Sequence, residues 1–296
     1  MYEELLDLYR KLEPLNIVAP PAHTIITPKI GVLLGLYGNL MGAMYVNETA
    51  IVPCTEPSEC RTSNIAPHLI HDNLSYVGNM PGYEKRFDAY MSQLKDYINH
   101  VEDPLAKAVY KHLSMGNGLL MAELKPLLDC IPVPAERISV VFGIPGMKTT
   151  INHDWTKYYV NSLPINGVCS ITGEPDYIPN SYPSNLRSQG DMAKLFQRSN
   201  KNTITDMQKC APGYIASQKI CHVLQWLSTG PDMIVGDDSG PLENYISIKE
   251  YARINGVDPA NIRQKISRGT LEAKKIGNEW LIDKDTPYKD ARKKEL

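Results

Sequence analysis

The feature that most constrains this 296-residue chain is a pair of helix start signals within its last fifty residues. Ser247–Glu250 has the form of a capping box, in which the serine accepts from an amide one turn on and the glutamate reaches back. The first helix would end at Asn255–Gly256. Almost at once, Asp258-Pro259 supplies an N-cap and a proline at the first helical position. The spacing predicts two short helices joined by a tight turn, the second over 259–268.

A hairpin signal follows the second helix. Gly277-Asn278 separates two runs with apolar positions, 271–276 and 279–282, and such a dipeptide is typical of a two-residue hairpin turn. Trp280 is expected to pack inward. Helix, turn, helix and basic hairpin together predict a winged helix-turn-helix over 245–296, which also resembles excisionase and MerR-type DNA-binding domains.

The second helix of this module carries polar side chains on its outer surfaces. Ile262 and Ile266 are four residues apart and should face inward. The remaining donors suit base edges in the major groove, while the hairpin would contact the phosphate backbone. A protein-docking module is the alternative, because a fold does not fix a function. The predicted contacts to double-stranded DNA are Asn261, Arg263, Gln264, Lys265, Arg268, Lys274 and Lys275.

Charge is distributed unevenly along the chain. Residues 245–296 hold 12 Lys and Arg against 8 Asp and Glu, which leaves 19 against 25 for residues 1–244. A basic module on an acidic body favours a polyanion partner, because lysine and arginine release counterions from phosphates. Many basic tails are only solvated, so the charge alone does not identify that partner.

The first three quarters of the chain predict a larger domain, residues 1–228, followed by a linker over 229–244. An amphipathic helix is expected over 83–101, a hairpin over 30–46 and long loops over 161–202. The fold class is therefore α+β, a mixed domain of helices and antiparallel strands followed by the small winged module. Further helices are predicted over 2–12, 105–114, 119–130 and 215–228, and a strand over 138–142.

The segments that come nearest to catalytic or metal-binding motifs lack the spacing that those motifs require. Gly143–Thr149 is too short for a phosphate loop and is expected to be a turn. Cys54, Cys60, His68 and His71 do not have zinc-site spacing. We therefore expect no catalytic residue, no metal, no cofactor and no enzymatic activity. Scattered cysteines and a start without an apolar leader predict a cytoplasmic protein without membrane contact.

One polar segment of the larger domain could hold nucleic acid. It begins at Arg61 and is followed by the pair Asp72-Asn73. A cation, small hydroxyls and amides suit phosphates and base edges, although the same residue types serve ordinary turns. The candidate nucleic-acid contacts here are Arg61, Thr62, Ser63, Asn64 and Asn73.

The same segment resembles the large subunit of the type I-C CRISPR interference complex, Cascade, in which an Arg-Thr-Ser-Gly-Ile-like run precedes an Asp-Asn-x-x-Tyr element. Ala19–Pro21, Cys169–Glu174 and Ala211-Pro212 resemble further family motifs in the same order, so the resemblance covers about residues 1–228. The chain departs from the pattern at Asn64, where the family usually has glycine. A Gly- and Ser-rich segment is replaced by 179–189, and the winged module stands where the family has a long helical half.

The resemblance implies docking on the CRISPR backbone subunits beside the crRNA, and inspection of the PAM in duplex DNA. We expect a non-enzymatic decoy that associates with the crRNA complex and inhibits interference. One alternative is a compact functional large subunit that recognises PAM DNA. The other is a transcription regulator that borrowed the larger domain.

Overall fold

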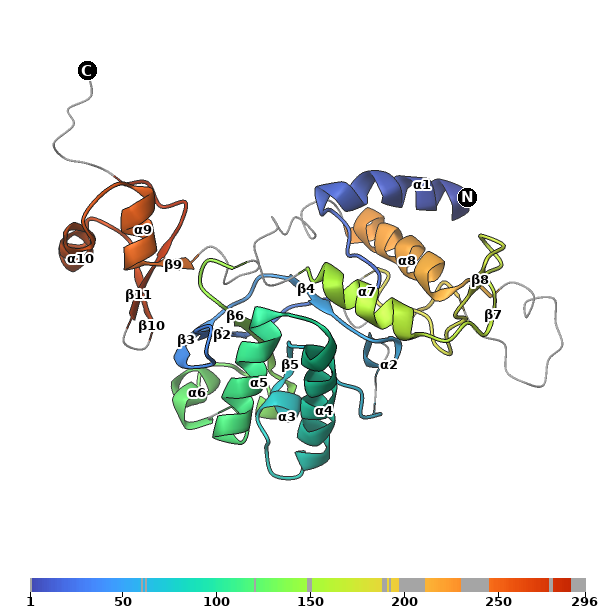
Figure 1. Cartoon of the computed structure of the whole chain (residues 1–296), viewed down its shortest axis with the longest axis horizontal. Coiled ribbons are helices and arrows are strands. Elements are labelled where there is room, and N and C mark those ends of the chain that lie inside the picture. The colour runs from blue at the N-terminus through green and yellow to red at the C-terminus, as the bar shows by residue number, and fades with distance from the viewer. Residues whose placement is uncertain are drawn as a thin grey trace, which may run out of the picture.

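The computed structural model describes residues 2–59, 61, 63–119, 121–147, 151–187, 191, 193–196, 211–229, 245–276 and 279–288. Helices and strands alternate through these segments, and both antiparallel and parallel strand pairs occur (Figure 1). The predicted mixed helix and strand fold is therefore confirmed. No described helix is both long enough and apolar enough to cross a lipid bilayer.

A four-stranded sheet lies at the centre of the larger part, in the order β3-β2-β6-β5. Strands β2 (Ile30–Leu34) and β3 (Leu40–Tyr45) form the predicted antiparallel hairpin. Strand β6 (Ser139–Gly143) runs parallel to β2, and the short β5 (Asp72–Asn73) is antiparallel to β6. Gly38 has φ +79° in the hairpin turn, which explains the glycine there.

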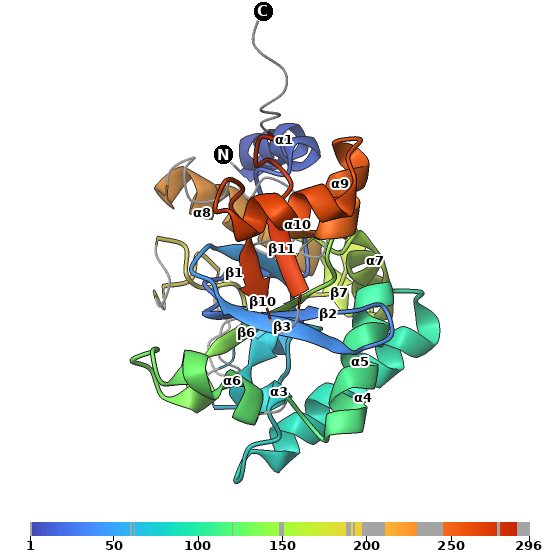
Figure 2. The same ribbon diagram turned by 90° about the vertical axis from the view of Figure 1, so that its left-hand side faces the viewer.

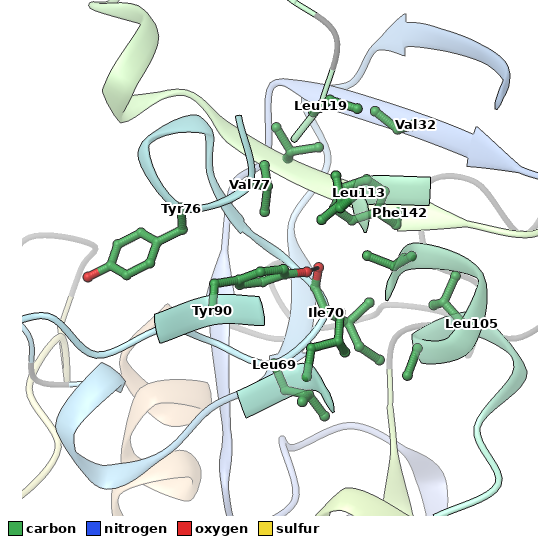
Figure 3. Close-up of a cluster of buried hydrophobic side chains, with 14 of the residues drawn as sticks. Val32, Leu69, Ile70, Tyr76, Val77, Tyr90, Leu105, Leu113, Leu119 and Phe142 are labelled. Atoms are coloured by element: carbon green, nitrogen blue, oxygen red, sulfur yellow. Dashed lines mark hydrogen bonds between the residues drawn. The ribbon is translucent and has the colours of Figure 1, made fainter. Parts of the chain in front are cut away.

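Helices cover one face of this sheet and enclose the main core. Side chains alternate along a strand, so Val32 and Phe142 face these helices. Figure 3 shows this core, with Tyr90 at its centre and the ring of Tyr76 at its margin. The covering helices are α3 (Leu74–Val77), α4 (Glu84–His100), α5 (Pro104–Gly116) and α6 (Met121–Leu128), with a 3-10 turn η2 (Ala135–Arg137).

The opposite face of the sheet is covered by strands. Leu33 and Val141 point to this side, toward the antiparallel pair β1 (His23–Ile26) and β4 (Ala50–Pro53). Leu281 from the C-terminal part packs into the same cluster and is only 1% exposed. The pairing of β1 with β4 was not predicted.

The remaining elements surround the central sheet. Helices α1 (Tyr2–Leu12) and α8 (Tyr214–Thr229) pack on each other, as Figure 1 shows. Helix α7 (His153–Ser162) was not predicted; its Trp155 is buried and donates to two backbone carbonyls. The described residues between 163 and 196 are mostly loop, as expected for them. The short elements are η1 (Glu13–Leu15), α2 (Glu56–Glu59), β7 (Gly167–Val168) and β8 (Pro175–Asp176).

The C-terminal part contains the predicted helices and hairpin, and one strand more. Ser247 accepts from the Glu250 amide at 3.2 Å, and Asp258 accepts from the Ala260 amide at 2.7 Å. The expectation that Glu250 reaches back to the amide of the capping serine is wrong, because its carboxylate instead pairs with Arg253 at 2.7 Å. The elements are β9 (Tyr245–Ser247), α9 (Ile248–Ile254), α10 (Pro259–Ser267), β10 (Lys274–Ile276) and β11 (Glu279–Asp283), with strand order β10-β11-β9.

The expected inward packing of Trp280 is wrong. Trp280 is 37% exposed, whereas Ile282 is fully buried in the cluster that includes Ile262. The two residues lie on the same face of β11, but only Ile282 reaches the core beneath the helices. Of the predicted linker, 229–244, only Thr229 is described. The domain boundaries therefore stay a prediction.

Candidate nucleic-acid interface

Arg61 is held in place by the residues that follow it. Its guanidinium donates to both carboxylate oxygens of Asp72, one of them at 2.8 Å, and to the Ala66 carbonyl at 2.8 Å. The same group lies 4.4 Å from the centre of the Tyr76 ring. Burial alone would lower the pKa of Arg61, but the Asp72 carboxylate outweighs burial and raises it. Arg61 is thus a permanently charged brace for this loop.

Asp72 is the buried centre of that brace. Its side chain is 0% exposed, and it also accepts from the amides of His68 and Asn73. Just before it, Ile70 adopts φ +64°, a strained conformation for a β-branched residue. The Tyr90 hydroxyl donates to the Ile70 carbonyl at 2.6 Å (Figure 3). The core of the larger part therefore fixes the loop that positions Arg61.

The braced loop forms one side of a pocket of about 340 Å³. Its walls come from the loop that carries Arg61 and Asn64 (the Arg61 loop), the end of β5, helix α3, the start of α4, and η2. Three arginines and two tyrosines meet there, a combination that suits phosphates and bases. The lining residues are Arg61, Asn64, Asn73, Tyr76, Tyr83, Arg86, Glu136 and Arg137.

Arg86 and Arg137 differ from Arg61 in how they are engaged. Arg86 donates to the Ser75 hydroxyl at 3.2 Å and lies 5.1 Å from the ring centre of Tyr83. Arg137 is exposed, and its side chain has no hydrogen bond or ion pair within the described part of the chain. The pocket thus offers one cation stacked on a ring and one available for an anion.

The structure brings together some of the predicted contacts of this segment. Asn64 and Asn73 line the pocket with Arg61, and Asn73 accepts from the Ser139 hydroxyl at 2.7 Å. Ser63 is exposed but does not line it, and Thr62 lies outside the described residues. Tyr76 belongs to the Asp-Asn-x-x-Tyr element but was not among the predicted contacts. Tyr83, Arg86, Glu136 and Arg137 were not predicted, because no local pattern joins 83–86 or 136–137 to the Arg61 loop.

A second basic surface lies on α10. Asn261, Arg263, Gln264 and Arg268 are exposed there, as predicted. Lys265 is half-buried, with its amine 4.8 Å from the ring centre of Tyr288. In Figure 2, α9 and α10 lie on the side of the β10–β11 hairpin away from β2 and β3. The hairpin therefore does not cover the outer surface of α10, which is open to a ligand such as a DNA groove.

The two hairpin lysines do not act as a pair. Lys274 lies opposite Leu281 in the strand register, which places it on the face turned toward the larger part. Its amine is 4.7 Å from the ring centre of Tyr245. Lys275 is exposed on the other face.

Two further sequence motifs have structural roles. The backbone of Cys169–Glu174 forms a tight turn, in which the Gly173 amide donates to the Cys169 carbonyl at 2.9 Å. His68 bonds to the Ser58 hydroxyl at 2.9 Å, and His71 accepts from the Phe142 amide at 3.1 Å. Cys60, from the zinc set considered above, lies outside the described residues. The described residues contain no group of three or more metal-ligating side chains.

Most of the chain matches a known protein family. A model of the family described as CRISPR-associated protein (Cas_Csd1) matches residues 3–239. The match includes every element from α1 to α8 and ends before β9. No curated protein matches the chain.

Proposed function

Because the chain belongs to the Cas_Csd1 family of CRISPR-associated proteins, we propose that it is a non-enzymatic nucleic-acid-binding subunit of a type I-C crRNA complex. The observation that carries this proposal is the arginine and tyrosine pocket, which lies wholly inside the family match. Arg137 and Arg86 supply the cations that a nucleic-acid backbone requires. The partners are the type I-C backbone subunits, the crRNA and double-stranded DNA.

The residues after the family match supply the contact to duplex DNA. Arg263 and Gln264 on helix α10 are exposed to solvent, and so is Arg268 at its C-terminal end. The elements follow the order helix, turn, helix and hairpin, which is the order in a winged helix-turn-helix. In that fold the second helix enters the major groove. Arginine and glutamine can each form paired hydrogen bonds with purine edges, so this surface can select a sequence.

We assign the protein the role of a decoy, an anti-CRISPR protein that occupies the large-subunit position and inhibits interference. The family elements support docking, whereas a different module follows them from β9 onward. A subunit that docks but carries the winged module in place of the family's long helical half would occupy the large-subunit position without completing the complex. PAM inspection would then take place without cleavage of the target.

The test is to co-express the chain with the type I-C complex in cells challenged by a targeted phage. Stable association with lost immunity is the expected result. Association with immunity restored in cells that lack the native large subunit would establish the compact functional subunit instead. Absence of association would favour the transcription regulator, and purified protein should then bind a palindromic duplex.

A further inference from the structure

The shape of the Arg61 pocket distinguishes among nucleic-acid ligands. Duplex grooves are read by elements that protrude from a protein, such as a helix or a hairpin. Here the basic residues line a concavity of about 340 Å³. A volume of that order can hold a single nucleotide but not a segment of double helix. The ligand must therefore enter as an isolated unit, such as a base turned out of its stack.

The wall made by Tyr83 and Arg86 can hold the flat face of a base. Tyr83 is half-buried, and the guanidinium of Arg86 lies 5.1 Å from its ring centre. Arg86 is also anchored by the Ser75 hydroxyl and lies 5.4 Å from the Tyr76 ring centre. Stacking on tyrosine rings and guanidinium planes is how proteins hold unpaired bases of single strands.

The edges of a base meet polar groups with available capacity. The Oδ1 of Asn73 accepts from Ser139, while its Nδ2 has no hydrogen bond within the described residues. Glu136 is half-buried in the lining and likewise has no such bond. An ionised carboxylate only accepts hydrogen bonds, so Glu136 favours a base with an amino group.

The phosphate of the same nucleotide would meet Arg137. This residue is exposed beside Glu136, at the end of η2, and no described residue neutralises it. Arg61 cannot serve this purpose equally well, because Asp72 already occupies its guanidinium. The pocket thus provides a stacking wall, an edge acceptor and one available cation.

We propose that this pocket receives one unstacked nucleotide of a single-stranded nucleic acid, with its base on Tyr83 and Arg86 and its phosphate on Arg137. The inference deepens the proposed function and rests on it. It assigns single strands to the pocket and leaves duplex DNA to α10. Bases with an amino group should bind more tightly than uracil.

The test uses the full chain and the four ribonucleoside 5′-monophosphates, with inorganic phosphate as the reference ligand. Binding is followed by ligand-observed NMR and by competition with a labelled single-stranded RNA. We expect each amino-bearing nucleotide to bind at least about ten-fold more tightly than phosphate, because stacking adds to the charge contact. Equal binding of phosphate and nucleotide would reduce the site to an anion site and overturn the inference.

Four variants separate the contacts. Tyr83→Ala should weaken nucleotide binding by about ten-fold or more and leave phosphate binding unchanged. Arg137→Ala should weaken the binding of both nucleotide and phosphate. Glu136→Gln should reduce the preference for amino-bearing nucleotides over uridine monophosphate. Arg10→Ala, an exposed arginine on α1, is the matched control and should change nothing.

The outcomes also separate this inference from the proposed function. If Tyr83→Ala and Arg137→Ala weaken duplex DNA binding while mononucleotides do not bind, the nucleotide inference fails and nucleic-acid binding by the pocket stands. If neither variant alters binding of any nucleic acid or association with the crRNA complex, the inference and the proposed use of the pocket fail together.

Discussion

Arg61 and Arg137 line the same pocket, but their substitution should have different consequences. Arg61→Ala leaves the carboxylate of Asp72 buried without its partner, which should cost about 3–5 kcal/mol of unfolding free energy. Arg137→Ala removes an exposed cation and should change stability by no more than about 0.5 kcal/mol, while weakening nucleic-acid binding. Urea unfolding and RNA titration of both variants measure the two effects.

The double variant Arg61→Ala/Asp72→Asn is the control for this interpretation. Removing the buried charge together with its partner should recover part of the lost stability, because the single variant is penalised mainly by the unpaired carboxylate. If Arg61→Ala unfolds at the wild-type urea concentration, the brace is not structural and Arg61 returns to the ligand contacts.

Three buried histidines should make the protein sensitive to acid. Burial lowers the pKa of His23 and His68 to about 3 and that of His222 to about 4. On unfolding their pKa returns to about 6.5, so the unfolded state binds more protons as pH falls below that value. Their contribution to stability is present above pH 6.5 and is lost as pH falls from 6.5 toward 3–4.

Glu59 acts in the opposite direction. Burial raises the pKa of Glu59 to about 7, so the contribution of this group to folding stability is lost as pH rises from about 4.5 to 7. With three histidines against one carboxyl, stability should rise between pH 5 and 6.5, by at most about 2.7 kcal/mol per pH unit. The melting temperature at pH 5, 6 and 7 measures this. An equal melting temperature at all three values contradicts it, and His100→Gln, at an exposed position, should leave the profile unchanged.

At the scale of elements, local signals explain which parts of the fold the sequence predicts. Helix α4 follows its apolar period, the β2–β3 hairpin follows its Asn and Gly turn, and α10 follows its cap. The β1–β4 pair joins segments far apart in the chain, and nothing local specifies that register. The pocket could not be predicted from local signals either, because Tyr83 and Arg137 meet the Arg61 loop only through tertiary packing.

Helix α10 allows a prediction at this scale. Arg263→Ala or Gln264→Ala should lower affinity for a specific duplex by about 1–3 kcal/mol and relax its sequence preference. Lys275→Ala should weaken the binding of all duplexes similarly, because a phosphate contact carries no sequence information. It should also reduce the slope of the logarithm of the binding constant against the logarithm of the salt concentration by about one. Electrophoretic mobility shifts at several salt concentrations distinguish the two patterns.

The control for α10 is Ile254→Ala, which changes an exposed residue at the end of α9. It should bind the duplex as the wild type does. If Arg263→Ala, Gln264→Ala and Lys275→Ala also leave binding unchanged, the C-terminal module is not a DNA reader and protein docking becomes its best assignment.

At the scale of the whole molecule, strand β11 joins the two parts. Its consecutive residues point to opposite faces, so Ile282 is buried in the module's own cluster while Leu281 is buried against Leu33, Met44 and Val141 of the central sheet. Figure 2 shows the hairpin reaching toward β2 and β3. The module should therefore unfold together with the larger part.

Leu281→Asp tests that coupling. A carboxylate at this position cannot be buried without a partner, so the module should separate from the sheet while its own core remains intact. Calorimetry should show one cooperative transition for the wild type and two for the variant. Trp280→Ala, one residue earlier and already exposed, should keep a single transition. A single transition for Leu281→Asp as well would mean that contacts other than Leu281 couple the parts. Two transitions for the wild type would mean that the parts are not coupled, and the duplex surface on α10 and the Arg61 pocket would then be independent sites. Coupling instead fixes their separation and lets one nucleic acid engage both.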